Sequence, residues 1–349
     1  MKALVTGGGG FLGRRIVELL LARGDEVSFI ARGKYPAVEA LGATGIQADL
    51  RDKTAVRAAV EGMDVVFHVA ALAKIWGPIE DFRSINVDAT RNIIDAMEDA
   101  GVPKLVFTST PSVTASGEPV RNGGMDVPYP EVNDSPYGST KAEAERMVTA
   151  ANSKHIATVS LRPRLIYGPR ENNMFPNFMA RARSGRIPQV GDGSNKADVT
   201  YIDNAAWAHL DALDALTDHT AVCAGKAYFI SDGTPVILWD WLGAFLDALD
   251  IPRPQRQVSY RMARMLGSAI QWFWRTFNMS GEPRMTPQIA TALGTDQYYD
   301  MEPAFRDLGY SIRVTHDQAT SAMIAWLLDG KASVTYADGT VVEYPADTV

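Results

Sequence analysis

The chain has little cysteine, no long apolar run and no excess of positive charge. Cys223 is the only cysteine among 349 residues, so no disulfide can form within the chain, which fits a reducing compartment. No run of 18 apolar residues exists that would predict a membrane-spanning helix. No basic-then-apolar leader precedes the strand that we expect from residue 2. These absences favour a cytoplasmic globular protein.

The charge balance and the length narrow the class further. Asp and Glu number 41 against 34 Lys and Arg, a net charge of −7, so a general attraction to nucleic acid is not expected. The hydrophobic share of 46% and the charged share of 21% are ordinary for a globular protein. A chain of 349 residues holds one large domain or two unequal ones.

Strand-like and helix-like segments alternate over the first 165 residues. Helical periodicity marks residues 85–100 and 136–151, and the unbroken apolar run at residues 64–70 suits a strand covered on both faces. Strands that alternate with helices predict an α/β fold, a doubly wound parallel sheet of the Rossmann type. The expected strands end near Thr6, Ala31, Ala48, Ala70, Ser109 and Arg162.

The regular alternation ends after residue 165, where turn-forming residues become frequent. Near the end of the chain, Asp338-Gly339 lies between alternating apolar residues and predicts a hairpin with a two-residue turn. We therefore expect a second, smaller lobe built from interleaved segments, followed by a hairpin-like tail. The expected division is a domain of residues 1–165 with a return segment at 197–231, a lobe of residues 166–196 and 232–330, and a tail of residues 331–349.

Three glycines follow the first expected strand at a spacing of three residues. Gly7 permits a tight turn, Gly10 lets the backbone approach a pyrophosphate, and Gly13 allows the next helix to pack closely on the strand. Free amides at the start of that helix would face the phosphates. A purely structural turn would also explain such glycines, but their position between a strand and a helix favours a dinucleotide site.

The end of the second expected strand indicates which dinucleotide binds. Arg32 and Lys34 follow this strand, and no acid stands at its end. An acid would bind the two hydroxyls of an adenosine ribose, whereas cations attract a 2′-phosphate. These two cations could instead be ordinary surface charges, but they favour NADP(H) over NAD(H).

Residues at the ends of the third and fourth expected strands complete the cofactor end of the site. Asp49 is positioned either to accept a hydrogen bond from an adenine amino group or to cap the helix that follows. Ala70 and Ala71 are small and leave room for a ligand. We expect His68, just before them, to be packed in its strand rather than catalytic.

Tyr137 and Lys141 lie four residues apart at the start of an expected helix, so both project from one face. Asp134 or Ser135 is expected to cap this helix. A free phenol has a pKa of about 10, and a nearby ammonium favours the phenolate and lowers that pKa. Such a phenol can protonate a carbonyl oxygen as hydride reaches its carbon. Tyr137 and Lys141 are therefore the predicted catalytic pair, and no metal site is predicted.

A third polar group is expected to hold the same carbonyl oxygen. The fifth expected strand ends with several hydroxyl-bearing residues, at the sheet edge where ligands bind. Thr110 is the first candidate for this role and Ser112 the second. Either hydroxyl could merely bond to the backbone.

Together these residues resemble the extended short-chain dehydrogenases/reductases, from residue 1 to about residue 330. Within that superfamily, residues 108–113 and 161–168 resemble the 3β-hydroxysteroid dehydrogenase branch. Further segments resemble the bacterial 2-alkyl-3-oxoalkanoate reductases of long-chain olefin biosynthesis: residues 190–195, 201–206, 224–231 and 299–303.

The resemblance implies roles for several residues. Tyr137 would donate the proton, Lys141 would bind the nicotinamide ribose and tune Tyr137, and Thr110 would orient the carbonyl. It also implies NADPH as the cofactor and a homodimer through the helices that contain Asn86 and Tyr137. The residues expected along the cofactor are Gly7, Gly10, Phe11, Leu12, Gly13, Arg32, Lys34, Asp49, Leu50, Ala70, Ala71, Asn86 and Pro163.

The two substrate classes share a local chemical pattern. A 3-oxoalkanoate has a carbonyl two carbons from a carboxylate, and a 3β-hydroxysterol with a 4-carboxylate has the same relation of groups. Arg164, or else Arg162 or Arg170, is therefore a candidate clamp for a substrate carboxylate. A structural salt bridge is the alternative for each of them.

Residues 262–278 predict an amphipathic helix with a wide apolar face. Trp272 and Trp274 stand near the borders of that face, and residues 251–281 contain five arginines and no acid. Three interpretations compete: a helix buried in the second lobe, the wall of a channel for an acyl chain, or a surface for a membrane or a pathway enzyme. Burial or substrate contact is the favoured interpretation.

These patterns indicate an NADP(H)-dependent oxidoreductase that interconverts a 3-oxo and a 3-hydroxy group on a hydrophobic substrate, with a 2-alkyl-3-oxoalkanoate as the first candidate. A 3β-hydroxysteroid (sterol 4-carboxylate) dehydrogenase is the nearest alternative. A nucleotide-sugar epimerase or reductase uses the same fold and tyrosine, but Arg32 and Lys34 count against it. A redox sensor or binding module would not need Tyr137 and Lys141.

Overall fold

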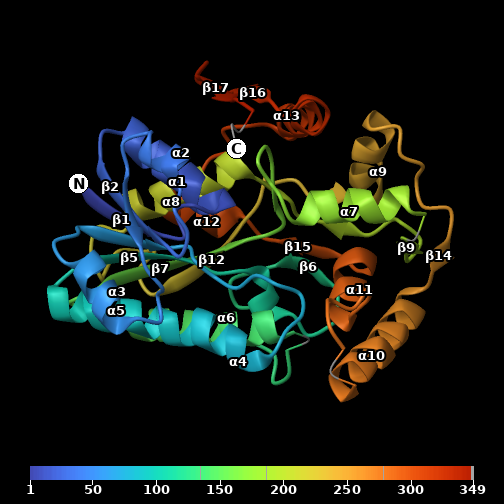
Figure 1. Ribbon diagram of the computed structural model, residues 1–349, viewed down its shortest axis with the longest axis horizontal. Helices are drawn as coiled ribbons and strands as arrows, with labels where there is room; N and C mark the ends of the chain where they lie inside the picture. The colour runs from blue at the N-terminus through green and yellow to red at the C-terminus, as the bar shows by residue number, and fades with distance from the viewer. Residues whose placement is uncertain (134, 186, 278, 347–349) are drawn as a thin grey trace.

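A sheet of seven parallel strands forms the centre of the molecule (Figure 1). The computed structural model describes residues 1–133, 135–185, 187–277 and 279–346. The strand order is β12-β7-β5-β4-β1-β2-β3, so the chain winds outward in both directions from β1, and the predicted doubly wound α/β fold is confirmed. The strands are β1 (Lys2–Thr6), β2 (Glu26–Ala31), β3 (Thr44–Gln47), β4 (Val65–His68), β5 (Lys104–Thr108), β7 (Ala157–Pro163) and β12 (Lys226–Ile230).

Helices cover both faces of this sheet (Figure 1). Because neither face meets water, a central strand is buried throughout, as are all four residues of β4. One face carries α3 (Lys53–Val60), α5 (Ala89–Ala100) and α6 (Pro136–Ala150), and the other carries α1 (Phe11–Ala22), α8 (Ile202–Ala215) and α12 (Glu302–Leu308).

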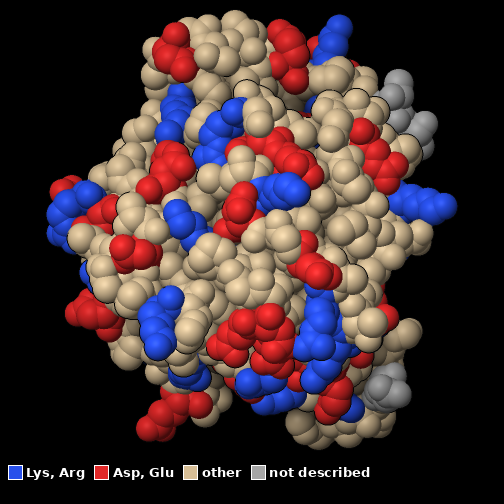
Figure 2. Space-filling model, turned by 90° about the vertical axis from the view of Figure 1, so that its left-hand side faces the viewer, with Lys and Arg blue, Asp and Glu red and all other residues tan. Residues whose placement is uncertain are grey.

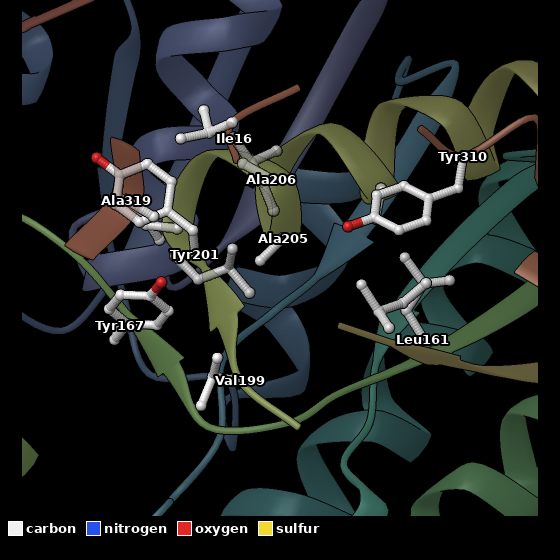
Figure 3. Packing of buried hydrophobic residues seen from close by; sticks show 14 of the residues in the cluster. Ile16, Leu161, Tyr167, Val199, Tyr201, Ala205, Ala206, Tyr310 and Ala319 are labelled. Carbon is white, nitrogen blue, oxygen red and sulfur yellow. The ribbon is translucent and has the colours of Figure 1, made fainter. Parts of the chain in front are cut away.

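The hydrophobic core has two parts, one on each face of the sheet. The smaller part lies against α3, α5 and α6. The larger part lies against α1 and α8 and continues into the second lobe (Figure 3). There Tyr167 and Tyr201 meet edge to face with ring centroids 5.7 Å apart. This shared core joins the two lobes without a linker between them.

The second lobe is built around a small mixed sheet, β13-β10-β15-β6, whose strands come from interleaved segments of the chain, as expected. Its strand β6 comes from within residues 1–165 and pairs with β15, so the chain enters this lobe earlier than the expected division places it. The strands are β6 (Val120–Gly123), β10 (Lys196–Ala197), β13 (Val236–Ile237) and β15 (Gln297–Tyr299), and the helices are α7 (Met174–Arg183), α9 (Leu238–Ala248), α10 (Tyr260–Thr276) and α11 (Pro287–Gly294).

Among the described residues, no helix is long and apolar enough to cross a bilayer. The face shown in Figure 2 carries acidic and basic side chains interspersed.

Shorter elements join the main ones. They are α2 (Pro36–Glu39), α4 (Ile79–Phe82), the π-helix η1 (Arg83–Asp88), the 3-10 helix η2 (Pro111–Thr114), β8 (Ile166–Tyr167) paired with β11 (Thr200–Tyr201), β9 (Gln189–Val190) paired with β14 (Gln257–Val258), and α13 (His316–Asp329).

The helix expected at residues 262–278 is α10, and it lies at the surface. Of its described residues only Ala263 and Gly267 are buried, whereas Trp272 is 64% exposed. Asn278, at the end of the expected helix, lies outside the described residues. The interpretation as a helix buried in the second lobe is therefore wrong, and the other two interpretations stay open.

The C-terminal tail forms a hairpin. Its strands β16 (Ala332–Thr335) and β17 (Val341–Tyr344) pair antiparallel. The backbone N–H of Tyr336 donates to the carbonyl of Thr340 at 2.8 Å, so residues 337–339 form the turn. The turn thus has three residues rather than the expected two.

Buried polar contacts fix this hairpin to α1. The Tyr344 hydroxyl donates to the Asp203 carboxylate, which also accepts from the Arg15 guanidinium. Nη2 of Arg15 donates in turn to the Tyr336 hydroxyl at 2.7 Å. Since Tyr344 is 1% exposed, the tail completes the core over α1 instead of extending away from it.

Two histidines are buried in the sheet region as neutral groups. His68 bonds through Nδ1 to the Thr6 hydroxyl at 2.8 Å and through Nε2 to the Thr90 hydroxyl at 2.9 Å, so its expected packing within the strand is confirmed. His209 donates its Nδ1–H to the carbonyl four residues earlier, and its Nε2 bonds to the Thr108 hydroxyl at 2.8 Å. Desolvation lowers the pKa of His68 to about 3 and that of His209 to about 4.

Replacing Tyr344 by alanine is expected to lower the free energy of unfolding by about 3–5 kcal/mol, because the change removes a buried ring and leaves the Arg15–Asp203 pair without its partner. Val341→Ala on the same strand is the control, since Val341 is 57% exposed, and its effect should stay within about 0.5 kcal/mol. Urea unfolding midpoints at equal slope measure both. Equal stability of the two variants would contradict the docking of the tail.

Acid is expected to destabilise the protein through the two buried histidines. Their folded pKa values lie below the unfolded value of about 6.5, so the unfolded chain binds more protons and stability falls as the pH drops from about 6.5 towards 4. The slope is at most about 1.4 kcal/mol per pH unit for each histidine. His209→Gln should flatten this slope, whereas His155→Gln, at an exposed position, should not. Unfolding curves recorded between pH 7 and pH 4.5 test this, and identical slopes for both variants would refute it.

Candidate active site

A cavity of about 910 Å³ opens at the carboxyl ends of the parallel strands. It lies where the strand order reverses between β1 and β4, which is where doubly wound sheets bind their ligands. The predicted site residues that line it are Gly7, Gly10, Phe11, Leu12, Gly13, Arg32, Asp49, Leu50, Ala70, Ala71, Thr110, Tyr137 and Pro163. The predicted residues that do not line it are Lys34, Asn86, Ser112, Lys141 and Arg164.

The glycine turn after β1 forms one wall of this cavity. Gly7 has a φ of +69°, a left-handed conformation that favours glycine. A Cβ atom at Gly13 would overlap the carbonyl of Gly7, so only glycine lets α1 approach the turn this closely. These two positions therefore need glycine for the geometry of the turn itself.

The start of α1 is suited to an anion. Its N-cap residue is Gly10, which offers no side chain to the first amides, and no acid stands in the first turn. The amides of Phe11, Leu12 and Gly13 lie at the cavity, and first-turn amides have no partner within a helix. The pyrophosphate of a dinucleotide would supply acceptors to these donors, so the residues present fit a nicotinamide dinucleotide.

Two arginines stand at the rim of the cavity beside Asp49. Arg32 follows β2, and Arg51 donates through Nη2 to the Asp49 carboxylate at 2.6 Å. The Arg51 hydrogen bonds lower the pKa of Asp49 to about 2. Asp52, not Asp49, caps α3 by accepting from two backbone amides, which rules out capping as the role of Asp49. Lys34 is exposed and lies outside the cavity.

Asn86 holds the walls of the site together instead of lining the cavity. It belongs to the π-helix η1, an irregularity that is common at functional sites. Its Oδ1 accepts from the backbone of Leu72, in the loop after β4, at 2.8 Å. Its Nδ2 donates to the Thr140 hydroxyl on α6 at 3.1 Å. Asn86 thus fixes the loop after β4 to the helix that carries Tyr137.

Tyr137 reaches the cavity from the first turn of α6. Ser135 caps this helix by accepting from the amide of Gly138 at 3.0 Å, while Asp134, the other expected cap, lies outside the described residues. Burial raises the pKa of Tyr137 to about 12, and a hydrogen bond with the Thr110 hydroxyl acts in the opposite direction. The expected lowering of this pKa is therefore wrong for the structure as described. The phenol is held in its protonated form.

Lys141 lies beneath the cavity, one turn further along α6. It is 2% exposed, and its Nζ donates to the carbonyl of Thr108 at 2.7 Å. Nζ also lies 3.9 Å from the centroid of the Phe107 ring. Desolvation lowers the pKa of Lys141 to about 7, and the carboxylate of Glu145 opposes that shift. With a pKa of about 7, Lys141 is only partly protonated near neutral pH, which reduces the positive charge available to lower the pKa of the Tyr137 phenol.

The two hydroxyl candidates differ in position. Thr110 lines the cavity, and its Oγ1 accepts from the backbone amide of Ser112 at 3.2 Å. Ser112 lies within η2 and does not line the cavity. Thr110 is therefore the hydroxyl that stands next to Tyr137 at the cavity wall.

The three candidate arginine clamps have different surroundings. Arg162 is buried in a two-pronged ion pair with Glu145, and Arg170 pairs with Glu18 at 2.7 Å. For these two, the salt-bridge alternative is the one observed. Arg164 donates through Nε to the carbonyl of Gln297, and its Nη2 is buried without a hydrogen-bond partner among the described residues. Arg164 thus keeps a free donor, although it does not line the cavity.

Several cavity residues were not predicted. Tyr35 packs on the glycine turn, because a Cβ at Gly9 would overlap its ring. Arg51 was missed although it closely follows the third expected strand, and strand ends were the signal that could have found it. The other unpredicted lining residues are Ile30, Ala31, Gly33, Ala48, Val69, Ala73, Ile85, Ala89, Thr108, Ser109, Leu165 and Ile166.

Known proteins resemble this chain over most of its length. It is 46% identical over 320 residues to a 2-alkyl-3-oxoalkanoate reductase of Stenotrophomonas maltophilia (strain K279a), with 91% of this chain and 97% of that protein covered. It is 38% identical over 332 residues to a 2-alkyl-3-oxoalkanoate reductase of Shewanella oneidensis, with 93% of this chain and 86% of that protein covered.

A solved structure shares the fold of this chain, and a family model matches most of its length. A dTDP-glucose 4,6-dehydratase from Streptomyces venezuelae, crystallised with NAD, superposes with a TM-score of 0.73 at 22% identity, covering 94% of this chain and 97% of that one. That likeness concerns the fold alone. The model of the 3-beta hydroxysteroid dehydrogenase/isomerase family matches residues 4–261. The chain belongs to the 3-beta hydroxysteroid dehydrogenase/isomerase family and is an oxidoreductase of the extended short-chain type.

Proposed function

We propose that this protein reduces 2-alkyl-3-oxoalkanoates to the corresponding 3-hydroxy acids with NADPH. Two relatives that carry this activity in their names match nearly the whole chain. The observation that carries the proposal is that Tyr137 and Thr110 line the same cavity as the glycine turn after β1. A proton donor and a dinucleotide site that share one cavity suit hydride transfer to a carbonyl.

The reaction needs one hydride and one proton. The nicotinamide cofactor, when bound, supplies the hydride. Tyr137 supplies the proton, because burial keeps its phenol protonated, with a pKa of about 12, and a protonated phenol is the donor that reduction requires. The Thr110 hydroxyl holds the carbonyl oxygen beside Tyr137. Lys141, one turn along the same helix, would hold the nicotinamide ribose, as the resemblance implies.

The substrate's carboxylate and its apolar body need separate partners. Arg164 remains the candidate for the carboxylate, because its Nη2 is buried without a hydrogen-bond partner among the described residues. Desolvation lowers the pKa of Arg164, and an anion beside it would offset that penalty. Arg162 and Arg170 are already paired and are not proposed for this role.

A 3β-hydroxysteroid dehydrogenase is the second candidate, because the matching family model carries that description. A sterol with a 4-carboxylate has the same spacing between its oxygenated carbon and its carboxylate as a 3-oxoalkanoate. The residues named above would serve either substrate, so only the shape of the apolar part separates the two.

An assay of NADPH consumption separates the candidates. A 2-alkyl-3-oxoalkanoate should be reduced, whereas a 3β-hydroxysteroid with NADP⁺ and a UDP-sugar should show little turnover. Tyr137→Phe should lower kcat by about 10²–10⁴, because it removes the proton donor and leaves the ring in place. Turnover confined to the steroid would favour the second candidate. Full activity of the Tyr137→Phe enzyme would refute the proposed role of the phenol.

The preference for NADPH is expected to depend on the two arginines at the rim. Arg32→Ala/Arg51→Ala should raise KM for NADPH by about tenfold or more, because charge-assisted bonds to a 2′-phosphate are lost, and should change KM for NADH little. Lys34→Ala is the matched control, since Lys34 lies outside the cavity. Steady-state kinetics with both cofactors measure the effect. An equal rise for NADPH and NADH would contradict recognition of the 2′-phosphate by these residues.

A further inference from the structure

Helix α10 packs on the protein through its smallest residues. Ala263 and Gly267 are its buried positions, and Gly267 lies against the start of α11. A Cβ atom at Gly267 would lie 2.7 Å from the backbone of Thr286, so this contact is close and leaves no room for a larger residue. A helix in a globular protein usually turns its large apolar residues toward the core. In α10 the two fully buried positions are small, and the large residues on the same side, Ile270 and Trp274, are only half-buried.

Most of the large apolar residues of α10 and of the turn after it are exposed. Trp272 is 64% exposed and Met265 is 65% exposed. Exposed apolar residues gathered in this way mark an interaction surface rather than ordinary scatter. The exposed face of α10 and its C-terminal turn is called here the α10 face, and it comprises Met262, Met265, Leu266, Trp272, Phe273, Phe277 and Met279.

The segment that carries the α10 face is rich in arginine. Residues 251–281 contain five arginines and no acid, although the whole chain has a net charge of −7. Arg261 and Arg275 are exposed on the helix itself. Arg253 forms an ion pair with Asp247 and therefore adds no net positive charge to this segment. Such a combination of exposed tryptophan, apolar surface and arginine complements an anionic lipid surface.

The α10 face lies next to the loops that lead away from the cavity. The Tyr260 hydroxyl donates to the carbonyl of Gly117, in the segment that follows Thr110 and η2. The Arg275 guanidinium stacks over the Trp76 ring with a distance of 5.6 Å, in the loop that begins beside the cavity after β4. Figure 1 shows α10 at one end of the molecule, beyond the small sheet. A surface bound through α10 would therefore lie close to both active-site loops.

We propose that the α10 face docks on an anionic lipid bilayer, with Trp272, Phe273 and Phe277 entering the headgroup region and Arg261 meeting lipid phosphates. A second copy of this chain fits less well, because a two-fold contact about α10 would bring the arginines of both copies together. The proposal goes beyond the reaction proposed above, and its test needs no turnover. For an enzyme with an apolar substrate, docking here would bring the active-site loops to the phase in which that substrate dissolves.

Flotation of the full-length protein with lipid vesicles tests the proposal. The wild type should float with vesicles that contain phosphatidylglycerol and should bind vesicles of phosphatidylcholine alone more weakly. Trp272→Ala/Phe273→Ala should lower the partition coefficient by about tenfold or more, because two aromatic side chains no longer enter the bilayer. Arg261→Gln should weaken binding severalfold to the anionic vesicles and not to the neutral ones.

The matched control is Leu41→Ala/Leu328→Ala, which removes two exposed apolar side chains that lie away from α10. This variant should float like the wild type. The proposal is overturned if the wild type stays at the bottom of the gradient with every vesicle, or if Trp272→Ala/Phe273→Ala floats as well as the wild type. Sedimentation without lipid tests the alternative that a second copy of the chain occupies the α10 face. A wild-type dimer that is lost in Trp272→Ala/Phe273→Ala, together with no vesicle binding by the wild type, would assign the face to a second copy.

Discussion

The parallel direction of the seven strands is the constraint on which the site depends. Because all of them point the same way, their carboxyl ends meet at one edge, and the reversal of strand order between β1 and β4 opens a cavity there. The glycine turn enters this edge from β1, and Thr110 enters it from the end of β5. Residues more than 100 positions apart in the chain thus line one cavity because of strand direction, without any direct bond between them.

At this site, burial determines the protonation states of Tyr137 and Lys141 more than neighbouring charges do. Tyr137 and Lys141 share a helix face, yet desolvation raises the pKa of the phenol and lowers that of the amine. Both shifts favour the uncharged forms, as expected for groups placed between a sheet and its covering helices. The arginines divide along the same principle. Arg162 keeps its charge at a fully buried position because Glu145 meets it with two hydrogen bonds.

The sequence predicted what local patterns determine. The ends of the sheet strands were predicted within two residues, and the glycine turn and the cap at Ser135 follow from short-range chemistry. Contacts between distant segments were not predictable from one sequence. The periodicity of α10 showed its wide apolar face but could not show that Ala263 and Gly267 would be the packed positions. Likewise, nothing near Asn86 indicated that its amide would join Leu72 to Thr140.

The docked tail links the two ends of the chain during synthesis. Arg15 is bonded to the Tyr336 hydroxyl, which is synthesised 321 residues later, and the Tyr344 hydroxyl that shares the Asp203 carboxylate follows later still. Until then part of the apolar face of α1 and the Arg15 guanidinium lack the residues that cover them. The sheet also lacks its edge strand β12 until residues 226–230 have been synthesised. The final packing around Arg15 therefore cannot form before residues 336–344 have been synthesised.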